Sequence, residues 1–204
     1  MSRRHLRWGG GLAAAGACLV LGMAAQPPGR SASADALPDL GALPPFTLID
    51  HAHRPVTRDT LAGRVWVADF IFTRCAGQCP LIQLTMQHVV AALAAEPTVR
   101  CVSFTVDPSH DTPPVLAEYA RHLRAPADRW LFLTGPEPDV QRLIRDGFRL
   151  SIAGEGTAAE PITHSIRLVL VDRAGHVRGY YPADEPAAVT RLLRDVRALL
   201  ADPG

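Results

Sequence analysis

Two cysteines are separated by three residues in the stretch "FIFTRCAGQCPLIQLTMQHVV", which contains Cys75 and Cys79. Thiolates attack disulfides and also bind soft metal ions, so the pair could form a redox disulfide or hold a metal. A purely structural disulfide is the third interpretation. It is the weakest of the three, because a bridge that closes so short a loop removes little chain entropy.

The flanking sequence predicts where this pair lies in the fold. The run "RVWVADFIF" (64–72) is typical of a buried strand that ends just before Cys75. A helix is predicted to begin near Cys79, and the partial positive charge at its N-terminus would stabilise thiolates. In α/β sheets, ligands bind at the carboxyl ends of strands. Apolar residues recur after the pair at helical spacing: Ile82, Met86, Val89 and Leu93.

Two thiolates leave a metal ion under-coordinated, so a third ligand should come from elsewhere in the fold. His164, in "EPITHSIRLVLVD", directly precedes a strand that we expect to pair close to the cysteine-bearing strand. Two thiolates and one imidazole suit copper, either Cu(I) or Cu(II), whereas zinc generally requires a fourth ligand.

A carboxylate follows the next strand along the chain. Asp107, in "VDPSHDTP", could orient a metal ligand, or it could simply form the turn before Pro108. Asp111 or Thr112 is expected to cap the helix of "DTPPVLAEYARHL". Cys101 lies within a strand pattern and is expected to be a small buried apolar residue.

The remaining elements alternate along the chain. The stretch 46–57 is predicted to form a hairpin, and strands and helices then follow one another to a closing pair of strands and a last helix. This order predicts an α/β fold with a mixed, mostly parallel central sheet, helices on both faces and an added N-terminal hairpin.

The N-terminal segment predicts export. Residues 1–25 combine a basic start with an apolar run, the layout of a signal peptide or membrane anchor, and 26–45 resemble a flexible linker before the domain at 46–204. Of 21 basic residues, four precede Asp35, which leaves 17 against 20 acidic residues in the rest of the chain. This balance gives no indication of a nucleic-acid partner.

Three stretches in combination resemble the signatures of the Sco/SenC family of copper-binding cytochrome c oxidase assembly proteins: "DFIFTRCAGQCP", "FTVDPSHDTP" and "THSIRLVLVDRAGHV". The resemblance implies a thioredoxin-like domain tethered to a membrane and facing the periplasm. It also implies that Cys75, Cys79 and His164 bind copper. Many members have proline directly after the first cysteine, where this chain has Ala76.

The resemblance further implies a client, the dinuclear CuA site of oxidase subunit II, served by copper delivery or by reduction of its cysteines. Other copper carriers are the remaining expected partners. One alternative is an extracytoplasmic thiol-disulfide oxidoreductase with Cys75 and Cys79 as its catalytic pair, and another is a copper or redox sensor. A thioredoxin-type reductase would have Cys-x-x-Cys, and proline where this chain has His164, so a metallochaperone is favoured over an enzyme.

Overall fold

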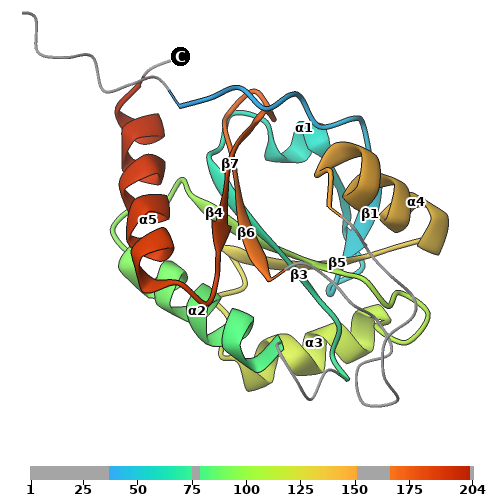
Figure 1. Ribbon diagram of the computed structural model, residues 1–204. Helices are drawn as coiled ribbons and strands as arrows, with labels where there is room; N and C mark the ends of the chain where they lie inside the picture. Colours follow the sequence, from blue (N-terminus) through green and yellow to red (C-terminus); the bar gives the residue numbers. More distant parts are fainter. Residues whose placement is uncertain (1–36, 75–78, 151–165, 203–204) are drawn as a thin grey trace, which may run out of the picture. The chain divides into compact units, whose positions relative to one another are not determined.

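The computed structural model describes residues 37–74, 79–150 and 166–202 of the 204-residue chain. Within these ranges each predicted strand and helix is present, and a short helix after the hairpin is an addition (Figure 1). The elements are β1 (Thr47–Asp50), β2 (Pro55–Thr57), α1 (Arg58–Leu61), β3 (Trp66–Ile71), α2 (Cys79–Ala92), β4 (Arg100–Thr105), α3 (Pro113–His122), β5 (Trp130–Thr134), α4 (Glu137–Arg142), the π-helical turn η1 (Leu143–Gly147), β6 (Arg167–Val171), β7 (Val177–Pro182) and α5 (Pro186–Ala201).

The strands form one mixed sheet in the order β2-β1-β5-β4-β3-β6-β7. Among the described strands, only the β3–β4 and β4–β5 pairings are parallel. The sheet is therefore less parallel than the alternation of elements predicted. Helices α2 and α3 join the three central strands in parallel, whereas hairpins, whose strands must run antiparallel, supply both flanks.

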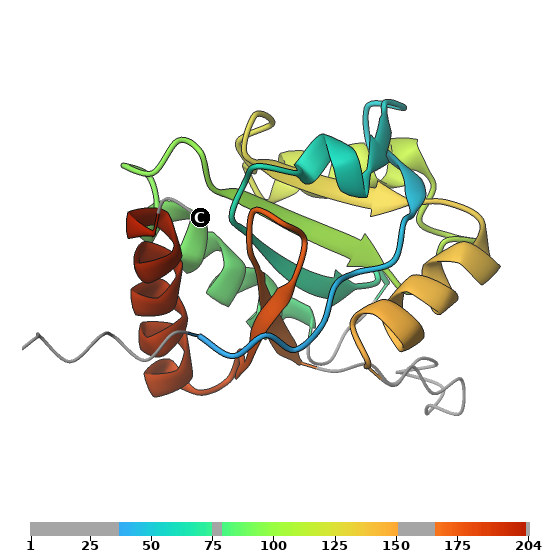
Figure 2. The same ribbon diagram turned by 90° about the horizontal axis from the view of Figure 1, so that it is seen from above.

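Helices cover both faces of the sheet, as the sequence predicted (Figures 1 and 2). One apolar cluster joins the sheet to α2, α3 and α5, and a second joins it to α1, α4 and η1. Strand β3 is buried along its whole length and contributes to both clusters. Because strand side chains alternate, Val67 and Ile71 face the α2 side and Trp66 and Phe70 face the α4 side.

Residues 37–45, which the sequence placed in a flexible linker, lie against the sheet. Leu43 is 1% exposed, and its N–H donates to the Gly175 carbonyl at 2.9 Å. The folded unit therefore begins ahead of Phe46. Proline- and alanine-rich composition suggested a tether here, but composition does not report hydrogen bonds that the backbone makes to a distant turn.

The expected signal or anchor segment, residues 1–25, lies outside the described residues, as do 26–36 of the expected linker. In the part of the chain that the structure describes, no helix is both long and apolar enough to span a membrane.

The packing of residues 37–45 against the sheet can be tested by truncating Leu43. Leu43→Ala should lower the free energy of unfolding by about 2–5 kcal/mol, because it leaves a cavity beneath the segment. Urea denaturation followed by circular dichroism measures the change. The control is Leu84→Ala, at a side chain that is 64% exposed, which should shift stability by no more than about 0.5 kcal/mol. Equal denaturation midpoints for wild type and Leu43→Ala would contradict the packing described.

Candidate metal centre

Three strands bring chain segments to one edge of the sheet. Parallel strands β3 and β4 end together, with Ile71 in register with Thr105. Strand β6 runs antiparallel to β3 and pairs Val169 with Ala68. Because the two strands run in opposite directions, Arg167, the first residue of β6, lies beside Phe70, near the end of β3. The chain therefore enters β6 at the edge where β3 and β4 end.

Two of the predicted ligands, Cys75 and His164, lie outside the described residues, and Cys79 is described only as the first residue of α2. Arg74, directly before Cys75, and Ile166, two residues after His164, are the nearest described residues. The described chain thus leaves β3 and enters β6 at the same edge, and the convergence of the three ligands stays a prediction.

Asp111 holds the turn that leads from β3 toward Cys75. Its buried carboxylate accepts hydrogen bonds from the Thr73 N–H at 3.1 Å, the Thr73 hydroxyl at 2.5 Å and the Thr105 hydroxyl at 2.6 Å. The expectation of a side-chain cap on α3 was wrong, because Thr112 occupies the N-cap position and makes no side-chain cap bond. Prolines open this helix and lack the N–H groups that a cap would satisfy.

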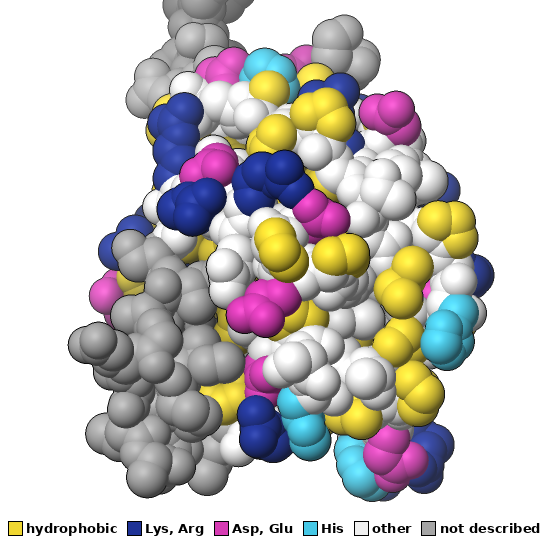
Figure 3. All heavy atoms as spheres, turned by 90° about the vertical axis from the view of Figure 1, so that its right-hand side faces the viewer, with side chains coloured by type: hydrophobic (Ala, Val, Ile, Leu, Met, Phe, Trp, Pro, Cys, Tyr) yellow, Lys and Arg dark blue, Asp and Glu magenta, His cyan; other side chains and the backbone are white. Residues whose placement is uncertain are grey.

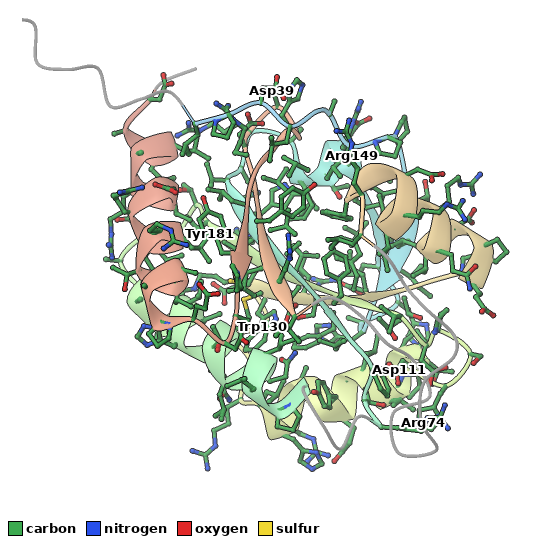
Figure 4. The ribbon with its side chains drawn as sticks, in the orientation of Figure 1. Asp39, Arg74, Asp111, Trp130, Arg149 and Tyr181 are labelled. Carbon is green, nitrogen blue, oxygen red and sulfur yellow. The ribbon has the colours of Figure 1, made fainter. Side chains whose placement is uncertain are left out.

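Asp107 binds the residue that precedes the first cysteine. Its Oδ2 lies 2.6 Å from a guanidinium nitrogen of Arg74, while Oδ1 accepts from the Ser109 hydroxyl at 3.0 Å. The pKa of Arg74 is raised by the hydrogen bond and charge of Asp107, and further by the charge of Asp111. Figure 4 shows Arg74 and Asp111 side by side beyond the end of β3. Sequence reasoning selected Asp107 but missed Arg74 and Thr73, which are polar residues directly after an apolar strand.

The other candidate ligands have different partners. Cys101 is a buried free thiol, as the strand pattern predicted, and burial raises its pKa. His176 Nδ1 lies 2.8 Å from Asp39, and His122 Nε2 lies 2.9 Å from Glu118. Across the described ranges, no group of three or more His, Cys, Asp or Glu side chains could hold a metal ion.

Charges are mixed on the face of the molecule drawn in Figure 3. Arginine side chains and acidic side chains are interspersed there. Among the described residues drawn on this face, basic side chains therefore form no continuous patch.

Comparison with known proteins decides the family. The family model described as SCO1/SenC matches residues 36–201. The chain belongs to the SCO1/SenC family. The resemblance seen in the three sequence stretches is thereby confirmed.

SCO1/SenC relatives match most of the chain. An SCO1 protein homolog of Bacillus subtilis is 31% identical over 156 residues, which span 76% of this chain and 80% of the relative. A protein of Stutzerimonas stutzeri, provisionally named copper-binding, is 33% identical over 150 residues, which span 72% of each chain.

A solved SCO1/SenC structure shows the same fold. BsSco, reported as a Sco-family cytochrome c oxidase assembly protein with a disulfide switch, matches with a TM-score of 0.71 and 30% identity. The match covers 80% of this chain and 96% of BsSco. The fold of this SCO1/SenC protein is thioredoxin-like, as expected.

The anchoring role of Asp111 predicts a stability loss. Asp111→Asn keeps the side-chain size but replaces one acceptor oxygen with an amide that can only donate, toward Thr73 and Thr105 groups that donate to the carboxylate in wild type. The free energy of unfolding should fall by about 1–3 kcal/mol in urea denaturation. Asp146→Asn is the control, since its carboxylate is half exposed and pairs with the neighbouring Arg145. The anchoring role is wrong if both variants unfold at the same urea concentration as wild type.

Proposed function

We propose that this SCO1/SenC protein is a copper-binding metallochaperone that assists assembly of the CuA site of cytochrome c oxidase. Cys75, Cys79 and His164 bind the copper ion, which is cargo for a client. One observation supports the proposal: the register of β3, β4 and β6 sets the end of β3, four residues before Cys75, and the start of β6, three residues after His164, at one edge of the sheet. Family membership and the copper-binding relative from Stutzerimonas stutzeri support it.

The surroundings of the pair favour thiolates. Helix α2 begins at Cys79, so the unpaired N–H groups and the positive end of a helix of 14 residues lie at the second cysteine. Arg74 precedes Cys75, but its charge is compensated by the Asp107 carboxylate. The helix terminus is therefore the effect that lowers thiol pKa values, and the thiolate is the form that binds copper.

Asp107 supports the site through Arg74. Its carboxylate is buried and the Arg74 side chain is half exposed, so the pair attaches the mobile end of the arginine to the end of β4. The guanidinium of the last described residue before Cys75 is thereby fixed to the segment after β4. In the proposed function, Asp107 orients the copper-binding turn without touching copper.

Redox state gates copper binding in this proposal. A Cys75–Cys79 disulfide has no thiolate to offer, and reduction opens the site. The disulfide switch reported for BsSco supports this step. The same switch favours a second function, an extracytoplasmic thiol-disulfide oxidoreductase that reduces client cysteines.

The proposed setting is the periplasmic side of the membrane, with residues 1–25 as signal or anchor. Proposed partners are oxidase subunit II, or a client with a similar copper site, and other copper carriers. The basic start and apolar run of the N-terminal sequence support this setting.

A Cu(I) titration against a competing chelator tests the ligand set, using reduced residues 34–204, which form one compact unit. Wild type should bind one copper ion per chain. His164→Ala should bind at least about tenfold more weakly because it loses a ligand. His122→Ala and Cys101→Ala are matched controls and should bind like wild type. If wild type fails to compete with a modest chelator, the oxidoreductase function replaces the metallochaperone.

The same titration tests Asp107. Asp107→Asn releases Arg74 and should weaken Cu(I) binding by about 10–100-fold, the usual range for residues that orient metal ligands. Asp172→Asn is the control, because Asp172 also pairs with an arginine, Arg178, at 2.7 Å, in the β6–β7 turn. Equal Cu(I) affinities for Asp107→Asn and wild type would contradict a role of Asp107 in copper binding.

Gating is tested by comparing the two redox forms. The disulfide form should bind no copper in equilibrium dialysis, and reduction by dithiothreitol should restore one ion per chain. Comparable copper binding by the oxidised and reduced forms would end the gating proposal.

A further inference from the structure

Three arginines lie where the three parallel strands begin, at the edge of the sheet opposite the candidate metal centre. Arg64 precedes β3 by two residues, Arg100 is the first residue of β4, and Arg129 directly precedes β5. The Arg100 N–H donates to the Val65 carbonyl at 3.1 Å, and the Cys101 N–H donates to the Arg129 carbonyl at 2.8 Å. The three strand starts are therefore neighbours in space as well as in the order of the sheet.

Two of these arginines line a surface pocket of about 270 Å³. Arg64 and Arg100 share it with Arg54 of the β1–β2 turn and with two carboxylates, Asp50 and Asp128. The Asp50 carboxylate is buried, and it is bound by the Arg54 side chain at 2.7 Å and by two backbone N–H groups at 2.8 Å. The exposed Asp128 is then the carboxylate left to balance Arg64 and Arg100, so positive charge is in excess in the pocket.

Backbone carbonyls fix the Arg100 guanidinium in place. Its Nη1 donates to the Pro97 carbonyl at 2.7 Å and to the Val99 carbonyl at 3.0 Å, and Arg100 forms no ion pair with a described carboxylate. Burial, and next the charge of Arg64, lower the pKa of Arg100, whereas the charge of Asp128 raises it. Arg64 and Arg100 thus lie close enough to repel each other, and an anion between them would relieve that repulsion.

Other arginines at this edge have a structural role. Arg129 Nη1 donates to the Leu93 carbonyl after α2 at 3.1 Å, and Arg173 Nη1 donates to the Leu199 carbonyl of α5 at 2.6 Å. Arginines in such positions satisfy carbonyls that the end of a helix leaves unpaired. Within the described ranges, the Arg64 side chain makes no hydrogen bond or ion pair. Its guanidinium can therefore bind a ligand without breaking a contact of the fold.

We propose that Arg64 and Arg100 form a binding site for a phosphate group, supplied either by inorganic phosphate or by a lipid headgroup. A guanidinium donates through a planar fork that matches two oxygens of a phosphate, and these charge-assisted bonds are stronger than bonds between neutral groups. A phosphate can accept from two arginines at once, whereas the two oxygens of a carboxylate are used by one fork. The site lies at a different edge from the candidate metal centre and does not depend on copper.

The chain enters the domain at the same edge, which makes a lipid headgroup one of the two sources. The Leu40 N–H donates to the carbonyl of Val177, the first residue of β7. Val177 pairs with the last residue of β6, which lies beside Trp66 at the start of β3. Figure 4 shows Asp39 at the opposite end of the domain from Arg74. A membrane anchor at the N-terminus, as proposed above, would tether this edge, and not the candidate metal centre, to the lipid surface.

The direct test is an NMR titration of residues 34–204 with inorganic phosphate at constant ionic strength. The side-chain Nε–H signals of Arg64 and Arg100 should shift and saturate. Arg64→Gln and Arg100→Gln should each weaken phosphate binding by at least about tenfold, since each loses a charge-assisted interaction. Arg64→Gln removes no hydrogen bond of the described structure, so loss of binding in this variant does not reflect misfolding.

A matched control separates the pocket from net charge. Arg145→Gln removes the same charge from an exposed arginine of η1 that pairs with Asp146, and it should bind phosphate like wild type. Equal weakening by Arg145→Gln and Arg64→Gln would overturn the inference. So would a response that sodium chloride reproduces at the same ionic strength.

Cosedimentation with vesicles distinguishes the two sources. Residues 34–204, which lack the proposed anchor, are mixed with vesicles of equal parts phosphatidylglycerol and phosphatidylcholine. Sedimentation of wild type but not of Arg64→Gln, reversed by inorganic phosphate, supports the site with a lipid headgroup as its ligand. Phosphate binding in solution without sedimentation supports the site with inorganic phosphate as its ligand. Binding to neither overturns the inference.

Discussion

The antiparallel pairing of β6 with β3 is the constraint on which the rest of the structure depends. Had β6 joined the sheet in the direction of β3, its first residues would lie at the opposite edge from the turn after β3. The reversed direction sets the start of β6 at the edge where two parallel strands end. The described residues that flank the predicted histidine and cysteine ligands, far apart in sequence, therefore belong to strands that meet at this edge.

Two buried carboxylates organise that edge by different means. Asp111 binds backbone and hydroxyl donors of Thr73, so it fixes the path of the chain. Asp107 binds the guanidinium of Arg74, so it fixes a charge. Both reach across from the segment after β4, and the edge is held together by polar contacts between loops. Such contacts cost more to break than exposed ion pairs, because removing one partner leaves a buried group unsatisfied.

Local sequence patterns predicted which segments form helices and strands, but not which side chains contact one another across the fold. The apolar run of β3 and the spacing of Ile82, Met86 and Val89 on α2 report burial, which sequence periodicity records directly. The prolines after Asp111 suggested a local cap, whereas its partner Thr73 lies 38 residues away. Periodicity assigns Asp69 to the α2 face, but its contact with Gln83 depends on how helix and strand pack. His164 was selected from its position before a strand expected to pair close to β3, and the motif resemblance implied the same ligand set, since no spacing relates His164 to the cysteines.

The burial of Cys101 bears on how the chain would mature in the extracytoplasmic setting proposed above. Three cysteines follow the N-terminal segment, and an unfolded chain could join any two of them. Once β4 is covered, the Cys101 thiol is sealed from oxidants and is hard to ionise, so it no longer competes for a disulfide. Formation of a Cys75–Cys79 disulfide, and not one to Cys101, would then require the sheet to fold over Cys101 before a thiol oxidase acts. A chain that folds slowly would be trapped with a bridge to the wrong sulfur.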